Sequence, residues 1–465
     1  MVEHRRQRRR QGLSAAGVAS LIAANMLVAS FATSASAATS GTRLWVTRYD
    51  GPAKTGDTAY AVAVSPDGTK VFVTGISDFI PGDYGTVAYE SATGTRLWVS
   101  RYDGPANGID LALDVAVSPD GSKVFVTGAS ETRHGFGWAT IAYDSSTGAT
   151  EWIRRHKGSS PTLAVSPDGT KVFVTGWAPS PTGDTDYATL AYSSATGATL
   201  WARRYDGPAH LDDVPYAVFA TPDAVVVTGR SSGSNATYVD YATVAYDPST
   251  GSRLWSRRYD GPGHSYDAAA AVTGSADGSK VFVTGASTET NGSTADYATI
   301  AYDGASGKKV WIRRYRTPSG SYAEFATATA DGSVVFVTGQ SQAFSGEDYA
   351  TVAYDGATGT RLWVARQSGP GSRLDGPNGI AASPDGTTVY VTGFISNGPL
   401  SGEDFGTFAY RASTGALLWS RFFSSAGRQL DEAWSVAASP DGSKVFVAGE
   451  VGGFPADYAT IAYAA

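Results

Sequence analysis

Short runs of alternating apolar and polar residues recur along almost the whole chain, and they predict β-strands. In one stretch, residues 112–117 alternate, a Ser-Pro-Asp-Gly turn follows at 118–121, and residues 123–127 return as a second strand. Proline presets φ and glycine takes the left-handed position in such a turn, so the two runs predict a hairpin. Residues 139–143 and 150–155 predict a third and a fourth antiparallel strand of the same unit.

This four-stranded unit recurs eight times, about 53 residues apart. The string Val-Phe-Val-Thr-Gly, or a close variant, ends at Gly75, Gly128, Gly176, Gly229, Gly285, Gly339, Gly393 and Gly449. A tryptophan recurs in the predicted fourth strand at Trp45, Trp98, Trp152, Trp201, Trp255, Trp311, Trp363 and Trp419. Four antiparallel strands at this period are typical of a propeller blade, and a linear solenoid of the same units is the alternative.

The two ends of the chain favour a closed ring over a solenoid. The eighth unit stops at residues 462–465 without a fourth strand, and residues 42–49 supply one before the first complete unit. Closing the last blade with this N-terminal strand removes the exposed sheet edge that an open array would leave. We therefore predict an all-β fold, an eight-bladed β-propeller with four antiparallel strands per blade.

The first 37 residues predict a secretion signal. An arginine-rich start, an apolar run over residues 13–31 and the small residues 35–37 form the expected order, and a membrane anchor is the alternative. The pair Arg9-Arg10 also fits a relaxed twin-arginine signal, so Sec and Tat export both stay open. We expect a secreted, extracellular protein with a single propeller domain at 38–465, and no cysteine is present to carry a lipoprotein anchor.

Composition narrows the classes of function. The chain has 465 residues, of which 42% are hydrophobic and 17% charged, so it can bury a large core. The absence of cysteine excludes a disulfide scaffold and a thiolate metal site. The net charge is −7 and becomes more negative without the basic N-terminal segment, which argues against a nucleic-acid partner. We expect a monomer with no transmembrane segment.

The repeat also carries a family resemblance. Seven unbroken copies of Ala-x-x-x-x-Thr/Ser-Gly-x-x-x-Trp, five of them with an acid at the third position as in Asp144, resemble the tryptophan-docking repeat of the quinoprotein eight-bladed propellers. Ala142, Gly148 and Trp152 belong to the same copy as Asp144. The resemblance implies that each of the eight tryptophans stacks on a turn of the neighbouring blade. The Ser-Pro-Asp-Gly-Thr-Lys segment is similar to the repeats of bacterial surface-layer and cell-surface propellers.

The chain departs from the catalytic members of that family. Family alcohol dehydrogenases hold pyrroloquinoline quinone (PQQ) between a tryptophan and a vicinal disulfide, beside a calcium ion and a catalytic aspartate. This chain has no cysteine and no long insertions, and the acid of the repeat is lost at Ser193 and Arg411. No cofactor is firmly implied: calcium stays open and PQQ is not expected. Non-catalytic members share the repeat, so the resemblance implies a scaffold and not a reaction.

Acidic and basic residues recur at the predicted face of variable loops. One set precedes the innermost strand and would surround the channel mouth as oxygen ligands for calcium, or else accept hydrogen bonds from its own loops: Asp57, Asp110, Asp213, Asp267, Asp375 and Asp431. A second set predicts loop caps: Asp83, Asp186, Asp240, Asp296, Asp348, Asp404 and Asp457. Arginines three residues beyond each tryptophan are expected to pair with acids between blades: Arg48, Arg101, Arg155, Arg204, Arg258, Arg314 and Arg366.

One region breaks the symmetry of the repeat. The candidate ligand-binding residues are Glu131, Arg133, His134, Trp138, His156 and Lys157. A histidine pair with an aromatic neighbour could form a pocket, or an acid–base pair with Glu131, and neutral variation of surface loops is the alternative. No catalytic residue is identified.

Three functions from different classes are compatible with these patterns. The first hypothesis is a secreted, non-catalytic propeller that binds a protein or a surface glycan through its variable-loop face. The second is a quinoprotein-like oxidoreductase that depends on PQQ and calcium. The third is a polysaccharide-active enzyme with acids of the variable face as general acid and base.

Overall fold

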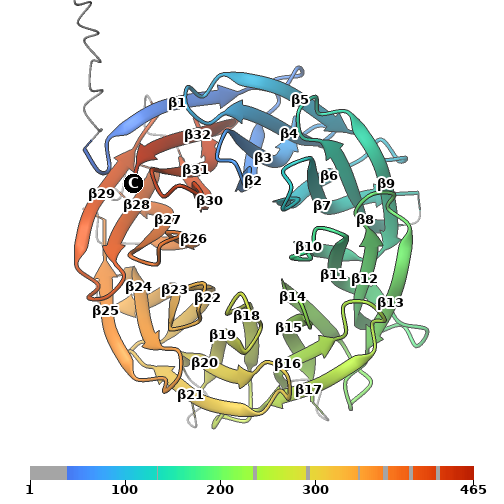
Figure 1. Cartoon of the computed structure of the whole chain (residues 1–465), viewed down its shortest axis with the longest axis vertical. Helices are drawn as coiled ribbons and strands as arrows, with labels where there is room; N and C mark the ends of the chain where they lie inside the picture. The colour runs from blue at the N-terminus through green and yellow to red at the C-terminus, as the bar shows by residue number, and fades with distance from the viewer. Residues whose placement is uncertain are drawn as a thin grey trace, which may run out of the picture. The chain divides into compact units, whose positions relative to one another are not determined.

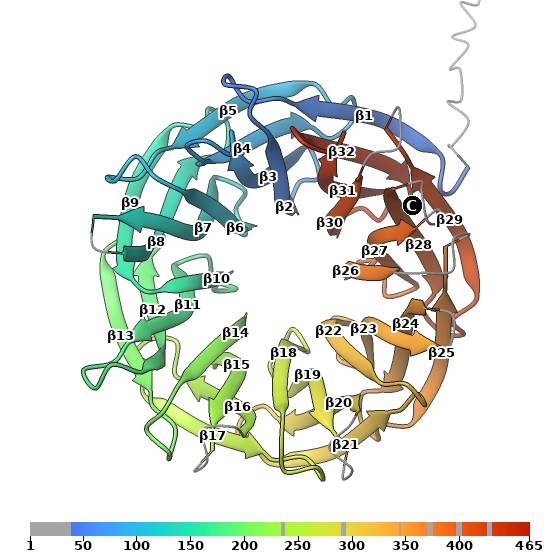
Figure 2. The same cartoon turned by 180° about the vertical axis from the view of Figure 1, so that it is seen from behind.

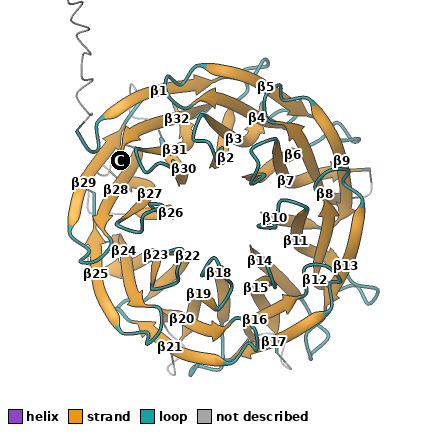
Figure 3. Cartoon of the chain, in the orientation of Figure 1, coloured by secondary structure: helices purple, strands orange, loops and turns teal. Residues whose placement is uncertain are grey.

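Every regular element of the computed structural model is a β-strand (Figure 3). The structure describes residues 39–133, 135–233, 238–289, 294–343, 346–369, 375–396, 402–425 and 430–465. Within them, thirty-two strands form eight four-stranded sheets, arranged as blades around a common axis (Figure 1; Figure 2, from behind). The prediction of an eight-bladed propeller is confirmed, whereas the predicted secretion signal at 1–37 lies outside the described residues.

Seven blades consist of four consecutive strands, which run in order from the axis to the rim. Blade 1 comprises β2 (Asp57–Val64), β3 (Lys70–Ser77), β4 (Asp83–Glu90) and β5 (Arg96–Tyr102). Blade 2 comprises β6 (Asp110–Val117), β7 (Lys123–Thr132), β8 (Gly135–Asp144) and β9 (Thr150–Lys157). Blade 3 comprises β10 (Ser159–Val165), β11 (Lys171–Pro179), β12 (Thr185–Ser193) and β13 (Thr199–Tyr205). Blade 4 comprises β14 (Asp213–Ala220), β15 (Val225–Ser232), β16 (Val239–Tyr246) and β17 (Arg253–Tyr259).

The remaining blades repeat this order. Blade 5 comprises β18 (Asp267–Gly274), β19 (Lys280–Thr288), β20 (Ala295–Asp303) and β21 (Lys309–Tyr315). Blade 6 comprises β22 (Ser321–Ala328), β23 (Val334–Ala343), β24 (Gly346–Asp355) and β25 (Arg361–Gln367). Blade 7 comprises β26 (Gly376–Ala382), β27 (Thr388–Ser396), β28 (Glu403–Arg411) and β29 (Leu417–Phe423). Blade 8 comprises β30 (Glu432–Ala438), β31 (Lys444–Val451), β32 (Asp457–Ala464) and β1 (Arg43–Tyr49).

Blade 8 closes the ring with strands from both ends of the described chain. Strand β1 pairs antiparallel with β32, and Trp45 lies opposite Ala462 in the register. Beyond the strand, the amide of Gly41 donates a hydrogen bond of 2.7 Å to the carbonyl of Ala464. The predicted closure by the N-terminal strand is therefore present, and β32 has no free edge.

Apolar side chains from adjacent blades form the core. Between blades 2 and 3, Phe125 and Trp152 pack with Val172, Val174 and Leu190, and all five are buried. Each such aliphatic or phenyl side chain contributes roughly 1.5–3 kcal/mol on burial. Equivalent clusters recur around the ring, so each blade is stabilised mainly by the faces of its two neighbours.

Each recurring tryptophan lies on the outermost strand of a blade, against a glycine turn of the next blade. The ring of Trp98 lies so close to Gly148 that a Cβ added there would meet its Cδ2 atom at 2.6 Å. The Trp98 indole also donates to the carbonyl of Ser145 at 3.1 Å. The ring-to-glycine pairs are Trp45 with Gly94, Trp152 with Gly197, Trp201 with Gly251, Trp255 with Gly307, Trp311 with Gly359, Trp363 with Gly415 and Trp419 with Gly41.

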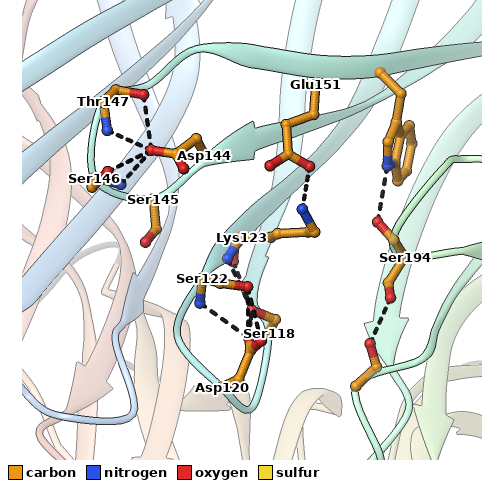
Figure 4. Close-up of polar contacts among 12 residues, drawn as sticks. Ser118, Asp120, Ser122, Lys123, Asp144, Ser145, Ser146, Thr147, Glu151 and Ser194 are labelled. Atoms are coloured by element: carbon orange, nitrogen blue, oxygen red, sulfur yellow. Dashed lines mark hydrogen bonds and ion pairs between the residues drawn. The ribbon is translucent and has the colours of Figure 1, made fainter.

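Short polar side chains fix the turns against which the tryptophans pack (Figure 4). Asp144 accepts hydrogen bonds from the amides and the hydroxyl groups of Ser146 and Thr147. These bonds lower the pKa of Asp144 to about 2. In the hairpin turn of the same blade, Ser118 and Ser122 bond the carboxylate of Asp120. The turns are therefore held rigid by local contacts, which keeps each glycine in position under its tryptophan.

We predict that Gly148→Ala destabilises the protein more than Gly442→Ala does. Both glycines have left-handed φ, +73° and +67°, so either alanine costs about 1–2 kcal/mol of backbone strain. Only at Gly148 must the new methyl group displace a tryptophan, which adds about 1–3 kcal/mol of overpacking; at Gly442 nothing lies within 4 Å. Thermal unfolding followed by circular dichroism measures the difference. Equal melting temperatures for the two variants would show that the ring contact contributes nothing.

Candidate functional site

The propeller has two chemically different faces. On the turn face, hairpin turns of one blade contact each other, as where the amide of Ser91 donates to the carbonyl of Thr69 at 2.8 Å. On the opposite face, which we call the loop face, connections between blades meet the loops between the second and third strands of each blade. There the amide of Ala53 donates to the carboxylate of Asp78 at 3.0 Å. The candidate residues from the sequence belong to the loop face.

The six aspartates predicted around the channel mouth are instead buried under interblade loops. In blade 4, Asp213 accepts a hydrogen bond of 2.5 Å from the amide of Gly207. The equivalent carboxylates bond the amides of their own loops: Asp57 with Gly51, Asp110 with Gly104, Asp267 with Gly261, Asp375 with Gly369 and Asp431 with Ser425. All six therefore make the bonds to their own loops that were the alternative to a calcium ring.

Four interblade loops share the sequence Tyr-Asp-Gly-Pro and a common turn. At Gly207 the carbonyl accepts the amide of His210, which has a left-handed φ of +52°. The His210 imidazole lies 2.6 Å from a carboxylate oxygen of Asp206, and this bond raises the pKa of the histidine. His264 repeats the arrangement with Asp260 in the next blade. Both histidines therefore act within their turns.

At these four junctions the loop brings three carboxylates together. Oxygen atoms of Asp186, Asp206 and Asp213 lie within 4.8 Å of one another and could hold a cation. Burial raises the pKa of Asp213 to about 6. Arg204, at 2.7 Å from Asp186, and His210 already supply positive charge to this group. The equivalent groups are Asp50 with Asp57 and Asp457, Asp83 with Asp103 and Asp110, and Asp240 with Asp260 and Asp267.

Four of the seven recurring arginines pair with acids of their own blade, so the expected acid pairs between blades are wrong for these four. Arg204 on β13 bonds Asp186 on the adjacent strand β12 at 2.7 Å, because the two residues are near neighbours in the sheet register. The same pairing joins Arg101 to Asp83, Arg258 to Asp240 and Arg314 to Asp296. The contact between blades is made with a tyrosine hydroxyl instead, as where Arg155 bonds Tyr102 at 2.8 Å.

Some of the residues of blade 2 that break the symmetry of the repeat pack inside the blade. Trp138 is fully buried and stacks on the His156 ring, with 4.4 Å between ring centroids. The two residues are direct cross-strand partners in β8 and β9. Burial lowers the pKa of His156, whose Nδ1 atom lies 2.8 Å from the carbonyl of Lys157. A tryptophan in this position reinforces the blade and presents no surface to a ligand.

Glu131, the proposed acid–base partner, is directed elsewhere. Its carboxylate accepts a hydrogen bond of 3.0 Å from the amide of Ile109 in the neighbouring interblade loop. Arg133 is exposed, and His134 lies outside the described residues. The structure thus brings Trp138 and His156 together and does not join them to Glu131.

The structure shows a set of channel-facing residues that the sequence motifs did not predict. In seven innermost strands the register shifts at one residue, as in β14 between Pro215 and Ala217, which leaves Tyr216 as a bulge. A β-bulge bends the strand and redirects a side chain. The bulged residues are Tyr60, Leu113, Tyr216, Ala270, Glu324, Asn378 and Trp434. The signal was available, because this position varies from alanine to tryptophan while its flanks repeat.

All seven bulged residues line one cavity on the axis of the ring. It has a volume of about 370 Å³ and receives residues from the innermost strands of all eight blades. Its charged side chains in the described part of the chain are Asp114 and Glu324, with no lysine or arginine among them. Asp114 accepts hydrogen bonds from the amide of Leu163 and the hydroxyl of Thr162, which ties blade 2 to blade 3.

A second cavity of about 640 Å³ adjoins the axial one between blades 4 and 6. Tyr216, Tyr266 and Tyr322 line it and are 41%, 44% and 39% exposed. Small residues of blade 5 separate the tyrosines, chiefly the alanines at 268–270, and Glu324 completes the lining. We call this cavity the tyrosine cleft. It shares Tyr216, Ala270 and Glu324 with the axial cavity, so the two are continuous.

Carboxylates gather at the other side of the channel, in blades 7 and 8. Glu432 and Glu450 are cross-strand partners, and they bond Asn378 and Thr58, respectively. Burial and the nearby charges of Glu403 and Glu450 raise the pKa of Glu432 to about 7, against the opposing effect of its bond to Asn378. A carboxyl group with such a pKa can donate or accept a proton near neutrality.

The eight-bladed ring, with one docking tryptophan per blade, defines the class of PQQ-like repeat propellers. The family model described as outer membrane protein assembly factor BamB matches residues 136–324 and 240–454, which together exceed half of the chain. The chain belongs to this family. No curated protein matches the sequence.

Solved structures with the same fold are distant in sequence. The quinohemoprotein alcohol dehydrogenase ADHIIG of Pseudomonas putida superposes with a TM-score of 0.54 at 12% identity, over 91% of this chain and 76% of that one. A quinohemoprotein alcohol dehydrogenase of Comamonas testosteroni gives a TM-score of 0.53 at 14% identity, over 90% and 76% of the two chains. At these identities the likeness shows the fold alone.

The residues of the channel do not fit pyrroloquinoline quinone. That cofactor carries three carboxylates, whereas every described residue that lines the axial cavity and the tyrosine cleft is acidic or neutral. The chain has no cysteine to form the vicinal disulfide that the resemblance implied. Like charges in a partly desolvated channel repel an anionic ligand.

The raised pKa of Glu432 predicts that the stability of the protein depends on pH. Because the folded state raises its pKa from 4.5 to about 7, the protonated carboxyl contributes stability that is complete below about pH 4.5 and lost as pH rises through 7. Wild type should therefore melt at a lower temperature at pH 8 than at pH 6, and Glu432→Gln should reduce this difference. Melting curves across this range provide the test, with the exposed Glu90→Gln as control. An unchanged pH profile for Glu432→Gln would contradict the assignment.

Proposed function

We propose that the protein is a secreted, non-catalytic propeller that binds a protein or a surface glycan through its loop face. The proposal rests on a difference within the repeat between residues that recur in the blades and residues that vary. Its recurring tryptophans, aspartates and arginines are engaged in contacts that hold turns, loops and blades together. The residues that differ between blades are those that face the channel and the loop face. Variable residues on a rigid repeat scaffold are typical of binding surfaces.

Exposed apolar side chains on the loop face support this proposal. The most exposed are Ile80 and Phe454, at 70% and 80%, and Phe454 stacks on Phe79 of the next blade with 6.1 Å between centroids. Ile109 and Leu430 are 44% and 56% exposed in loops of the same face. Monomeric soluble proteins rarely expose contiguous apolar patches without an interaction to cover them.

The description of the matching family also supports the binding of a protein partner. Its description names an assembly factor, which is a protein that acts on other proteins. The two enzymatic alternatives have less support: the channel does not fit the quinone, and the carboxylates of Glu432 and Glu450 already bond Asn378 and Thr58.

The proposed location rests on the N-terminal sequence. Residues 1–37 would direct export through Sec or Tat, and the monomeric propeller would act outside the cell. In the described part of the chain, no helix has the length and apolar character needed to cross a bilayer.

We expect purified residues 38–465 to sediment with cell envelopes of the producing bacterium. The loop-face double variant Ile80→Ser/Phe454→Ser should reduce the bound fraction about tenfold, because two exposed contacts are removed from the interface. The matched control is Leu97→Ser/Leu254→Ser, which removes two side chains that are 45% and 46% exposed on outermost strands. Protease or periodate treatment of the envelopes distinguishes a protein from a glycan partner.

This experiment has two outcomes that count against the proposal. The first is failure of the wild-type protein to sediment with the envelopes. The second is an equal loss of binding in the loop-face and outer-strand variants, which would mean that general surface hydrophobicity and not the loop face carries the interaction.

A further inference from the structure

We propose that the tyrosine cleft is a binding site for a neutral glycan, with pyranose rings stacked on Tyr216, Tyr266 and Tyr322. This inference rests on the proposed function and names its ligand class. The cleft has a volume of about 640 Å³, within the range of about 300–1,000 Å³ for small-ligand sites.

The three tyrosines converge from three different positions of the repeat. Tyr216 is the bulged residue of β14, Tyr266 immediately precedes β18, and Tyr322 is the second residue of β22. A structural role that recurs with the repeat would place the same residue at the same position in every blade. Instead, three consecutive blades each contribute one tyrosine from a different position to a single cavity. This convergence breaks the symmetry of the ring in a way that packing does not require.

Blade 5 opens the space between the tyrosines. Its bulged position holds Ala270, where blades 1 and 8 hold Tyr60 and Trp434. In those two blades the large residues fill the channel wall and contact each other, with 5.6 Å between their ring centroids. The alanines at 268–270 leave a recess between the tyrosines of blades 4 and 6.

The rings of these three tyrosines are accessible to a ligand. Each is about two-fifths exposed, while the tyrosines of the third strands, such as Tyr241 and Tyr297, are completely buried. A tyrosine offers a flat apolar ring and a polar hydroxyl at low entropic cost. The apolar C–H face of a pyranose matches such a ring, and its hydroxyl groups match the phenol oxygens.

Charge selects among glycans. Among the residues that the structure describes, Glu324 is the charged one that lines the cleft, and no lysine or arginine does. A carboxylate accepts hydrogen bonds from sugar hydroxyls and repels uronic acids, sulfated sugars and phosphates. The net charge of the chain, −7, acts in the same direction. The ligand is therefore an uncharged sugar chain and not an acidic polysaccharide or a nucleic acid.

The cleft is open along its length. It joins the axial cavity through Tyr216, Ala270 and Glu324, and Tyr266 lies at the loop-face end of β18. A linear oligosaccharide can therefore lie across blades 4 to 6 while its ends extend into solvent. This geometry fits internal units of a chain better than a single monosaccharide.

Isothermal titration calorimetry of residues 38–465 with cellohexaose, xylohexaose, mannohexaose, maltohexaose and chitohexaose tests the site. At least one neutral hexasaccharide should bind, and Tyr266→Ala should weaken it about tenfold through loss of stacking. Tyr266→Phe should retain most of the affinity because it keeps the ring. The matched control is Tyr238→Ala, which removes a tyrosine that is 43% exposed outside the cleft and should change affinity less than about twofold. A trigalacturonate titration is expected to show no binding.

The inference is overturned if none of the five hexasaccharides binds with a dissociation constant below 10 mM, a limit that corresponds to about −2.7 kcal/mol. It is also overturned if Tyr238→Ala weakens binding as much as Tyr266→Ala. Envelope sedimentation that survives periodate treatment and the tyrosine variants would leave the proposed function in place with a protein partner. If the wild-type protein binds a hexasaccharide but does not sediment with envelopes, the proposed envelope partner is wrong and the glycan site in the cleft is supported.

Discussion

The contact between an indole ring and a glycine of the next blade is the constraint on which the whole ring depends. At Gly148 and its equivalents, the turn adopts a left-handed φ that disfavours any side chain, and the absent Cβ makes room for the ring. An arginine two residues beyond the tryptophan often adds a second bond, as where Arg203 donates to the carbonyl of Gly251 at 2.8 Å. One residue type thus sets both the conformation of a turn and the distance between two blades. Repeated eight times, this contact fixes the angle between neighbours and hence the number of blades that close the ring.

Because the outer strands hold the ring together, the side chains that face its axis can differ from blade to blade. In six of the eight blades, the innermost strand is anchored at its start by a buried aspartate that bonds its own loop. A turn such as that at Ser118 and Asp120 holds the end of the strand. Between them, the bulge removes one residue from the ladder, and that residue faces the channel with few packing demands. Tyrosine, tryptophan, alanine, glutamate and asparagine all occur there without altering the strand. The scaffold therefore tolerates chemical change at the position that seven of the blades direct to the axis.

The sequence predicted the architecture because eight copies of one pattern average out local ambiguity. Blade number, strand order and closure by residues 42–49 all follow from the repeat. The candidate site was harder to predict. Its position before a strand left Asp213 with two possible roles, as a calcium ligand or as a partner of its own loop, and the structure shows its bond to the amide of Gly207. Trp138 broke the pattern and proved to be an interior residue. The tyrosine cleft depends on a bulge and on contributions from three blades, and neither the bulge nor the convergence is encoded in the spacing of any single motif.

The pairing of β1 with β32 gives the molecule an unusual order of assembly. Seven blades are made from consecutive strands, so each needs only its own segment of about 50 residues and the face of a neighbouring blade to form. The eighth needs strands separated by more than 400 residues, which is the largest loop-closure entropy in the fold. The earliest strand to be synthesised is therefore the last to find its partners. Until that moment the blades form an open arc with two exposed sheet edges, and the pairing of β1 with β32 converts this arc into a closed ring.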